Sequence, residues 1–112
     1  MKNIEMLENQ LALGRLRDSG EKMDIEVSYA IASNMIAMEK ALDPYIEERK
    51  NLEEKHRKED GTIDAKGMEG DEDFKRLNEI EVDCDIRKVP MEKLPKEISV
   101  QDMIALHFML EN

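Results

Sequence analysis

The sequence predicts a mostly α-helical protein, a small helical bundle around one long kinked helix, with a short edge strand or hairpin as a minor β component. Three observations carry this prediction: an apolar stripe with helical spacing, capping residues at the expected helix ends, and one short alternating segment. The stripe advances in steps of four and three residues, and Arg49 fills the register before its last member. Its members are Ile31, Met35, Met38, Leu42, Tyr45 and Leu52. This spacing places all of them on one face of an amphipathic helix.

The long helix is expected over residues 24–58, with Asp24 as its N-cap. Pro44 falls inside the pattern, where a proline removes one backbone hydrogen bond and clashes with the preceding turn. Asp43 and Pro44 could instead begin a second helix, as N-cap and first helical residue. The stripe keeps its phase across the proline, so we favour a kink at residue 44 over a break.

Two further helices flank the long one. Apolar residues at helical spacing predict a helix over residues 3–18, with Asn3 as its N-cap and Gly20 just beyond its end. Ser99 and Asp102 resemble a capping box at the start of a C-terminal helix over residues 99–111. That helix is apolar nearly all round, so its side chains either complete the core or form a partner or oligomer interface. The candidates for such an interface are Met103, Leu106, Phe108 and Leu110.

The segment between the long helix and the C-terminal helix is less regular. Residues 59–73 are polar and contain three glycines, which predicts an acidic loop with a hairpin turn at Asp60-Gly61. Residues 74–90 are expected to form a short helix and then a strand, because apolar and charged residues alternate over 82–87. Pro90 would confine such a strand to a sheet edge.

The length and the charge of the chain limit the classes of function that it can have. A chain of 112 residues is one domain, 1–112. Its 27 acidic and 17 basic residues give a net charge of −10, which disfavours direct binding to nucleic acid or to an anionic membrane and favours a basic protein surface as partner. A single cysteine, Cys84, and the lack of an apolar run of about 20 residues point to a cytoplasmic protein without a membrane segment. Nine methionines and no tryptophan favour a pliable core, for which pairing with a second copy would supply extra burial.

Motifs for chemistry are not recognisable. Residues 60–64 imitate the middle of a calcium-binding loop, but Lys58 occupies a ligand position in that register. Phosphate-binding, dinucleotide-binding and zinc-binding patterns are missing from the sequence. We therefore expect no enzyme activity, no metal and no cofactor. His56 is expected in solvent, and His107 at the edge of the core.

Acidic residues gather in the second half of the chain and are the candidate partner-binding surface. They are Glu69, Asp71, Glu72, Asp73, Glu79, Glu81, Asp83 and Asp85. Such residues could also be the solvent face of an edge strand, where charge discourages pairing with another sheet.

Two runs, VSYAIASNMI at 27–36 and EKALDPYIEER at 39–49, resemble a family of small phage and prophage proteins of Gram-positive bacteria, known as a domain of unknown function. The order of the following parts is also similar: a glycine-bearing acidic loop, a short acidic strand and a capped terminal helix. The resemblance implies a viral or prophage origin and a non-enzymatic role in the host cytoplasm.

Two functions follow as hypotheses. The first is an antagonist, similar to anti-CRISPR proteins, whose acidic surface blocks a basic surface of a host protein that handles nucleic acid or acts in defence. The second is a virion assembly accessory, such as a tail or head chaperone, which binds through apolar helix contacts.

Overall fold

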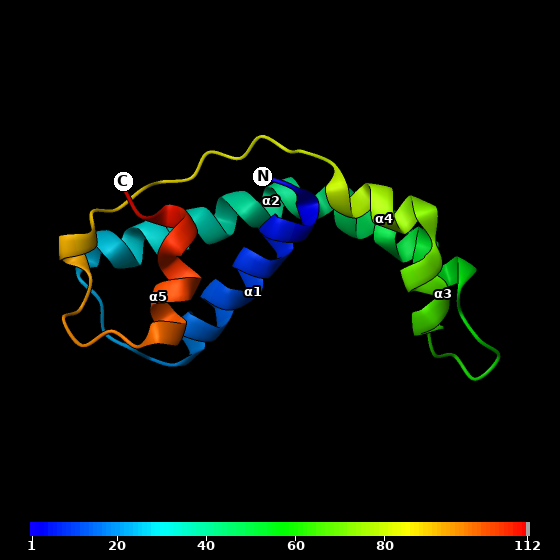
Figure 1. The fold of residues 1–112 in the computed structure, drawn as a ribbon, viewed down its shortest axis with the longest axis horizontal. Helices are drawn as coiled ribbons and strands as arrows, with labels where there is room; N and C mark the ends of the chain where they lie inside the picture. The colour runs from blue at the N-terminus through cyan, green and yellow to red at the C-terminus, as the bar shows by residue number, and fades with distance from the viewer. Residues whose placement is uncertain (112) are drawn as a thin grey trace.

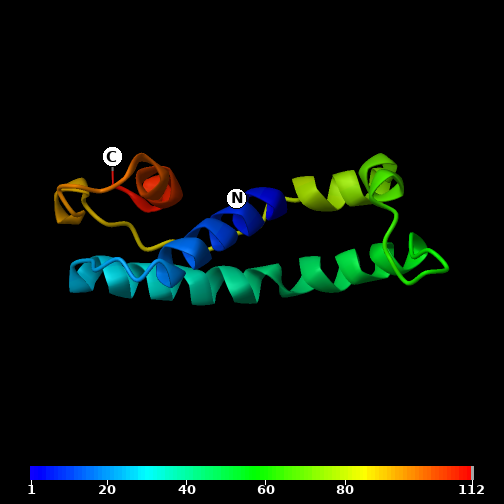
Figure 2. The ribbon, with the colours of Figure 1, turned by 90° about the horizontal axis from the view of Figure 1, so that it is seen from below.

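One long helix, α2 (Ile25–Lys55), runs along the whole molecule, and the other helices lie on one side of it (Figure 1 and Figure 2). The computed structural model describes residues 1–111. The remaining elements are α1 (Asn3–Asp18), α3 (Ala65–Gly70), α4 (Glu72–Glu79), the 3₁₀ turn η1 (Met91–Lys93), α5 (Val100–Leu106) and the 3₁₀ turn η2 (His107–Met109). The predicted fold class, mostly helical around one long helix, is confirmed. The predicted domain, 1–112, also includes Asn112, which lies outside the described residues.

The molecule has two regions, which we call the body and the arm. The body contains α1, the first two-thirds of α2, the strap (residues 80–90) and α5 (Figure 1). The arm contains α2 from Tyr45 onward, residues 56–64, α3 and α4. The overall extents are 50 × 28 × 19 Å and the radius of gyration is 16.6 Å. A compact chain of this length would have a radius of gyration of about 13 Å, so the arm makes the molecule elongated.

Helix α2 is continuous through Pro44 and bends beyond its midpoint (Figure 1). Proline is tolerated because its ring lies on the exposed side of the helix. The Asp24 carboxylate accepts a hydrogen bond from the backbone N of Glu26 at 2.9 Å, as expected for an N-cap. The apolar stripe faces inward: four members are buried, and Met35 and Leu52 are half-buried. The helix ends at Lys55, three residues earlier than expected.

Helix α1 has the expected bounds, and its ends are capped. Lys2, and not Asn3, is the N-cap, and its backbone N donates to the Glu5 carboxylate at 3.0 Å. Gly20, just beyond the C-terminus, has φ +72°, a conformation that glycine adopts without steric cost. These caps fix the length of α1 along the body.

Helix α5 is shorter than the predicted 99–111. The Ser99 hydroxyl accepts from the backbone N of Asp102 at 3.1 Å, as predicted for the N-cap. The α-helix ends at Leu106 and tightens into η2, because the strap captures the backbone that follows. The backbone N of Val89 donates to Met109 O at 2.9 Å, and Glu111 N donates to Val89 O at 2.9 Å.

The predicted acidic loop, residues 59–73, is a loop only over its first part and is helical from Ala65, apart from Asp71. The turn at Asp60-Gly61 does form: Gly61 has φ +88°, and Lys58 N donates to Thr62 O at 2.8 Å. After this turn the chain enters α3 and then α4. The prediction of a loop was wrong here because glycines were read as helix breakers, whereas Gly67 and Gly70 lie inside a six-residue helix.

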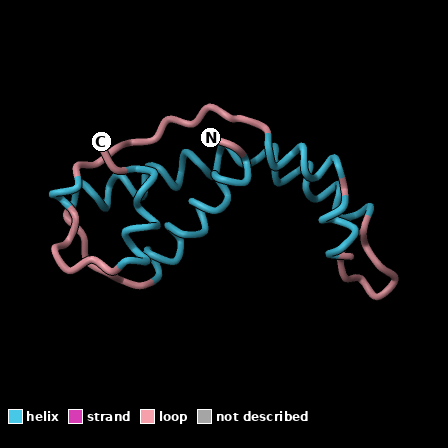
Figure 3. The backbone as a smooth tube through the Cα atoms, in the orientation of Figure 1, coloured by secondary structure: helices cyan, strands magenta, loops and turns pink. Residues whose placement is uncertain are grey.

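The strap is extended but forms no strand in the part of the chain that the structure describes (Figure 3). Its side chains alternate as predicted, with Val82, Cys84 and Ile86 half-buried and the acidic residues between them exposed. Only isolated bridges occur, Lys2 with Glu81 and Val89 with Leu110. The predicted edge strand is therefore an extended segment that packs on helices, because no second extended segment lies alongside it.

Candidate protein-binding surfaces

The C-terminal helix contributes mainly to the core. Leu106 is fully buried and Leu110 is 8% exposed, while Met103 and Phe108 are half-buried against the core. These four residues, predicted as a partner or oligomer surface, therefore complete the body. Because α5 packs against α1, its exposed apolar side chains are instead Val100 and Ile104, at 79% and 71%.

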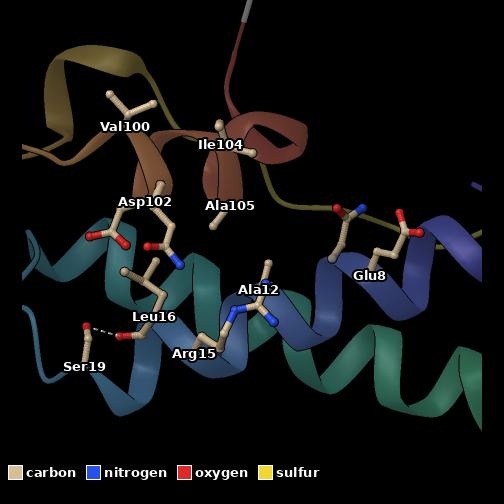
Figure 4. Close-up of a pocket in the computed structure, with 11 residues that line it drawn as sticks. Glu8, Ala12, Arg15, Leu16, Ser19, Val100, Asp102, Ile104 and Ala105 are labelled. Carbon is tan, nitrogen blue, oxygen red and sulfur yellow. Dashed lines mark hydrogen bonds between the residues drawn. The ribbon is translucent and has the colours of Figure 1, made fainter.

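A groove of about 600 Å³ separates α5 from α1 (Figure 4). Val100 and Ile104 form its α5 rim, and the small side chains Ala12 and Ala105 lie on its facing sides. Charged side chains border the groove on both helices; they are Glu8, Arg15 and Asp102. A hydrogen bond with the Asp102 carboxyl group raises the pKa of Glu21 near this groove. An apolar rim with a polar border is typical of a site for an amphipathic partner segment.

Four of the predicted acidic residues form ion pairs, two within α4 and two with the N-terminal residues. Glu72 pairs with Lys75 at 3.3 Å, and Asp73 pairs with Arg76, both within α4. Glu79 pairs with Lys2 at 2.5 Å. The Glu81 carboxylate lies 3.1 Å from the Met1 amine. Exposed ion pairs of this kind contribute little to stability. These four carboxylates can therefore leave their present partners and pair with basic residues of another protein.

Asp71 was predicted on the acidic surface, but its side chain points inward and is only 6% exposed. As N-cap of α4, its carboxylate accepts from the backbone N of Asp73 at 2.9 Å and of Phe74 at 3.4 Å. His56 Nε2 donates to the same carboxylate at 2.8 Å, and Lys55 Nζ donates at 3.3 Å. The hydrogen bond from His56 is the largest of several that hold the Asp71 pKa well below its usual range. Asp71 is therefore a structural residue of the arm.

His56 and His107 do not lie where they were expected. His56 was expected in solvent, but its side chain is 19% exposed and bound to Asp71. Its ring packs so closely on α3 that a Cβ at Gly67 would lie 2.7 Å from His56 Nδ1. His107, expected at the core edge, is exposed. The histidine at position 56 thus joins the end of α2 to the start of α4.

The remaining predicted acids, Glu69, Asp83 and Asp85, are exposed and form no ion pair within residues 1–111. They belong to a larger acidic segment, residues 43–85, which holds 16 of the 27 acidic residues and eight of the 17 basic ones. Most of the net negative charge of the chain therefore lies on the arm and the first half of the strap.

Asn34 has a structural role that the sequence analysis missed. Its side chain is fully buried on the inner face of α2. Its amide donates to Arg87 O at 3.0 Å and accepts from Arg87 N at 2.8 Å, so it replaces a strand partner for the strap. The Arg87 guanidinium then lies 5.1 Å from the Tyr29 ring centroid. The sequence does contain a signal for this role: Asn34 is in helical register with the apolar residues Ile31 and Met38, which makes it a polar residue on the buried face.

Chemistry-bearing side chains are sparse. Burial raises the pKa of the Cys84 thiol, and the Asp85 carboxylate adds to this, so the sulfur is a weak nucleophile at neutral pH. Over residues 1–111, no three His, Cys, Asp or Glu side chains come together as a possible metal site. No helix in the described chain is both long enough and apolar enough to span a membrane.

Comparison with protein-family models, with curated proteins and with solved structures finds no significant match to this chain.

Proposed function

We propose that this chain is a non-enzymatic binding protein whose acidic segment, residues 43–85, docks on a basic surface of another protein. In its most concrete form, the proposal is a phage- or prophage-encoded inhibitor of a host protein that handles nucleic acid or acts in defence, similar in action to an anti-CRISPR protein. The observation that carries it is the concentration of negative charge on an arm that projects from the body.

Grooves that hold nucleic acid are lined with lysine and arginine, which neutralise phosphates. A projecting arm with excess carboxylates is complementary to such a groove in charge and could occupy the path of the phosphate backbone. Glu69, Asp83 and Asp85 supply exposed carboxylates that are not engaged with a base of the described chain. The resemblance of residues 27–36 and 39–49 to small phage proteins is the reason for expecting a host protein as the partner.

The test is capture from host lysate with the purified chain as bait, at about 50 mM and about 300 mM salt. Because exposed charges are screened over roughly 10 Å at 0.1 M salt, binding through the acidic segment should weaken by about tenfold or more at the higher salt. The combined variant Asp83→Lys and Asp85→Lys should lose the captured protein. Glu92→Lys with Glu97→Lys, two exposed acids outside the segment, is the control with an equal change of charge and should retain it. Displacement of the captured protein by DNA or RNA would identify its basic groove as the bound surface.

A second candidate, a virion assembly accessory, is favoured by the groove with exposed Val100 and Ile104. Binding there should be nearly insensitive to salt and should be lost in Val100→Asp with Ile104→Asp. Leu106→Asp is unsuitable for this purpose because Leu106 is a core residue. Recovery of virion proteins alone from phage-infected lysate, with unchanged binding by the Asp83/Asp85 variant, would reject the antagonist in favour of this candidate.

A further inference from the structure

Helix α2 carries a second apolar stripe on the side that faces away from the core. Ile25, Tyr29 and Ile36 are 81%, 61% and 65% exposed, and Ala32 between them is also exposed. Two other elements touch the stripe: the Arg87 guanidinium of the strap lies 5.1 Å from the Tyr29 ring centroid, and Leu11 of α1 lines a groove with Ala32 and Ile36. All four members of the stripe nevertheless remain exposed. The stripe is therefore a largely uncovered apolar surface on the longest helix of a highly charged protein.

The spacing of this stripe is that of a helix-pairing seam. Its members follow in steps of four, three and four residues, which are successive d, a, d and a positions of a heptad repeat. At about 100° per residue, the stripe lies roughly opposite the buried one on the helix circumference. A helix that contributes to a single core needs only one apolar face. The second face on α2 thus indicates a second helical neighbour.

We propose that this neighbour is α2 of a second copy of the chain, packed antiparallel about a twofold axis that passes between residues 30 and 31. In this register Tyr29 faces Ala32 of the second copy, and Ile25 faces Ile36 of the second copy. Each large ring lies over a small side chain, and the symmetry repeats both contacts. This assembly goes beyond the proposed function and does not depend on it.

The self-complementary spacing of the stripe supports a second copy as the occupant, because the same four side chains pair in both directions about the twofold axis. Lys22 lies in the non-helical segment before the N-cap Asp24, and the antiparallel arrangement brings this segment toward Glu39 of the second copy, so the symmetry places a basic residue near an acidic one at each end of the seam. The apolar stripe ends where Glu39 and Lys40 begin, so a longer partner helix would meet charged positions. The stripes of the two copies therefore have equal length, Tyr29 of each copy faces the small Ala32 of the other, and opposite charges lie near each other at both ends.

Neighbouring residues of α1 widen the seam. Leu11 is 56% exposed and lines a shallow groove together with Gly14, Ala32 and Ile36. The seam from residue 25 to 36 is about 16 Å long at 1.5 Å per residue. This is small for a stable interface, so we expect a dimer that dissociates in roughly the micromolar range.

The first test is sedimentation of the full chain over a concentration series. Ile36→Glu should shift the monomer–dimer midpoint at least about tenfold to higher concentration. Its melting temperature should be unchanged at concentrations where both chains are monomeric, because the side chain is exposed. Ile104→Glu changes an equally exposed isoleucine on α5 and should leave the midpoint unchanged.

The salt dependence distinguishes this dimer from the proposed docking. Two chains of net charge −10 repel each other, so added salt should strengthen the dimer, whereas it should weaken docking of the acidic segment. A chain that stays monomeric at about 0.5 mM in high salt, or a dimer that responds to Ile104→Glu and not to Ile36→Glu, overturns the proposal.

Disulfide crosslinking then tests the orientation, in a Cys84→Ser background. A mixture of Ile25→Cys chains and Ile36→Cys chains should form the crosslinked dimer, because these positions face each other in the antiparallel register. Each variant alone should crosslink poorly, since its own pair is separated by about 16 Å along the axis. Efficient crosslinking of Ile25→Cys with itself would show a parallel pair and would overturn the register.

Discussion

The body and the arm are held together by different kinds of interaction. The body contains nearly all of the buried apolar residues, including Met6, Leu13 and Leu106, which are fully buried. Beyond Tyr45, Met68 is the one buried hydrophobic residue in the described arm. The arm relies instead on the buried carboxylate of Asp71 and its hydrogen bonds.

Further polar contacts lie within the arm, between α2 and α4. The Tyr45 hydroxyl donates to Asn78 Oδ1 at 2.7 Å, and Arg49 lies over the Phe74 ring at 5.5 Å. Apolar burial is insensitive to ionisation, whereas the hydrogen bonds of the Asp71 carboxylate depend on it. The arm should therefore open separately from the body, at lower free energy, as a local unfolding unit.

The largest effect is expected from a cavity in the body. Leu106→Ala should lower the global free energy of unfolding by about 2–5 kcal/mol, because it removes buried methyl groups and leaves a void. Met68→Ala is the counterpart in the arm and should mainly speed amide hydrogen exchange in α3 and α4. Urea unfolding and hydrogen exchange of both variants measure this difference. Equal losses of global stability would show that body and arm form one cooperative unit.

The next effect concerns the strap. Asn34→Ala should cost about 1–3 kcal/mol, because it leaves the backbone N–H and C=O of Arg87 without their partners. The Arg87 amide should lose protection from exchange while the α4 amides keep theirs. Asn51→Ala, on the exposed side of α2 in the arm, is the matched control and should be near neutral. Unchanged protection at Arg87 would contradict the role of Asn34.

The arm should respond to acid through Asp71. The pKa of Asp71 is lower in the folded arm than its unfolded value of about 3.9, so the folded arm binds fewer protons. Its contribution is fully present above about pH 5 and is lost as the pH falls through the folded pKa. Exchange protection of α3 and α4 should thus decline in acid before that of α1. In Asp71→Asn, the arm should be less protected at neutral pH and should lose less protection below pH 5 than the arm with Asp71. The remaining loss comes from Glu54 and Asp60, whose pKa values are lowered by hydrogen bonds with Arg57 and Thr62.

The sequence predicted the elements whose signals are local. Helical spacing and capping residues located α1 and α2 to within a few residues, and the phase of the stripe across Pro44 correctly indicated one continuous helix. Alternation over 82–87 correctly indicated an extended segment with one buried side. These features depend on neighbours in the chain, so a single sequence contains them.

Features that depend on distant contacts were not predictable in the same way. Asp71 was interpreted as one of several exposed acids. Its N-cap bonds to Asp73 and Phe74 are local, but its contact with His56, fifteen residues away, could not be predicted from neighbouring residues. The strap has no strand partner, and Asn34, 53 residues from Arg87, bonds the backbone of Arg87 in its place. The helical spacing of the exposed stripe, from Ile25 to Ile36, is present in the sequence. Only the positions of α1 and α5 show that the stripe is largely uncovered.

The smallest effect is expected from a glycine-to-alanine change made once in the body and once in the arm. This pair of variants is also the most direct comparison of the two regions. Gly14→Ala should raise the stability of the body by about 1 kcal/mol, because alanine favours the helix and its Cβ would meet no atom within 4 Å. Gly67→Ala lies in α3, where the new Cβ would be 2.7 Å from His56 Nδ1 and 2.8 Å from Asp64 Oδ2. The His56 ring is fixed by its bond to Asp71, so it can make room only by weakening that contact. The two variants should therefore change thermal stability and α4 exchange protection in opposite directions, and a stabilised Gly67→Ala arm would show that the His56–Asp71 contact does not hold it.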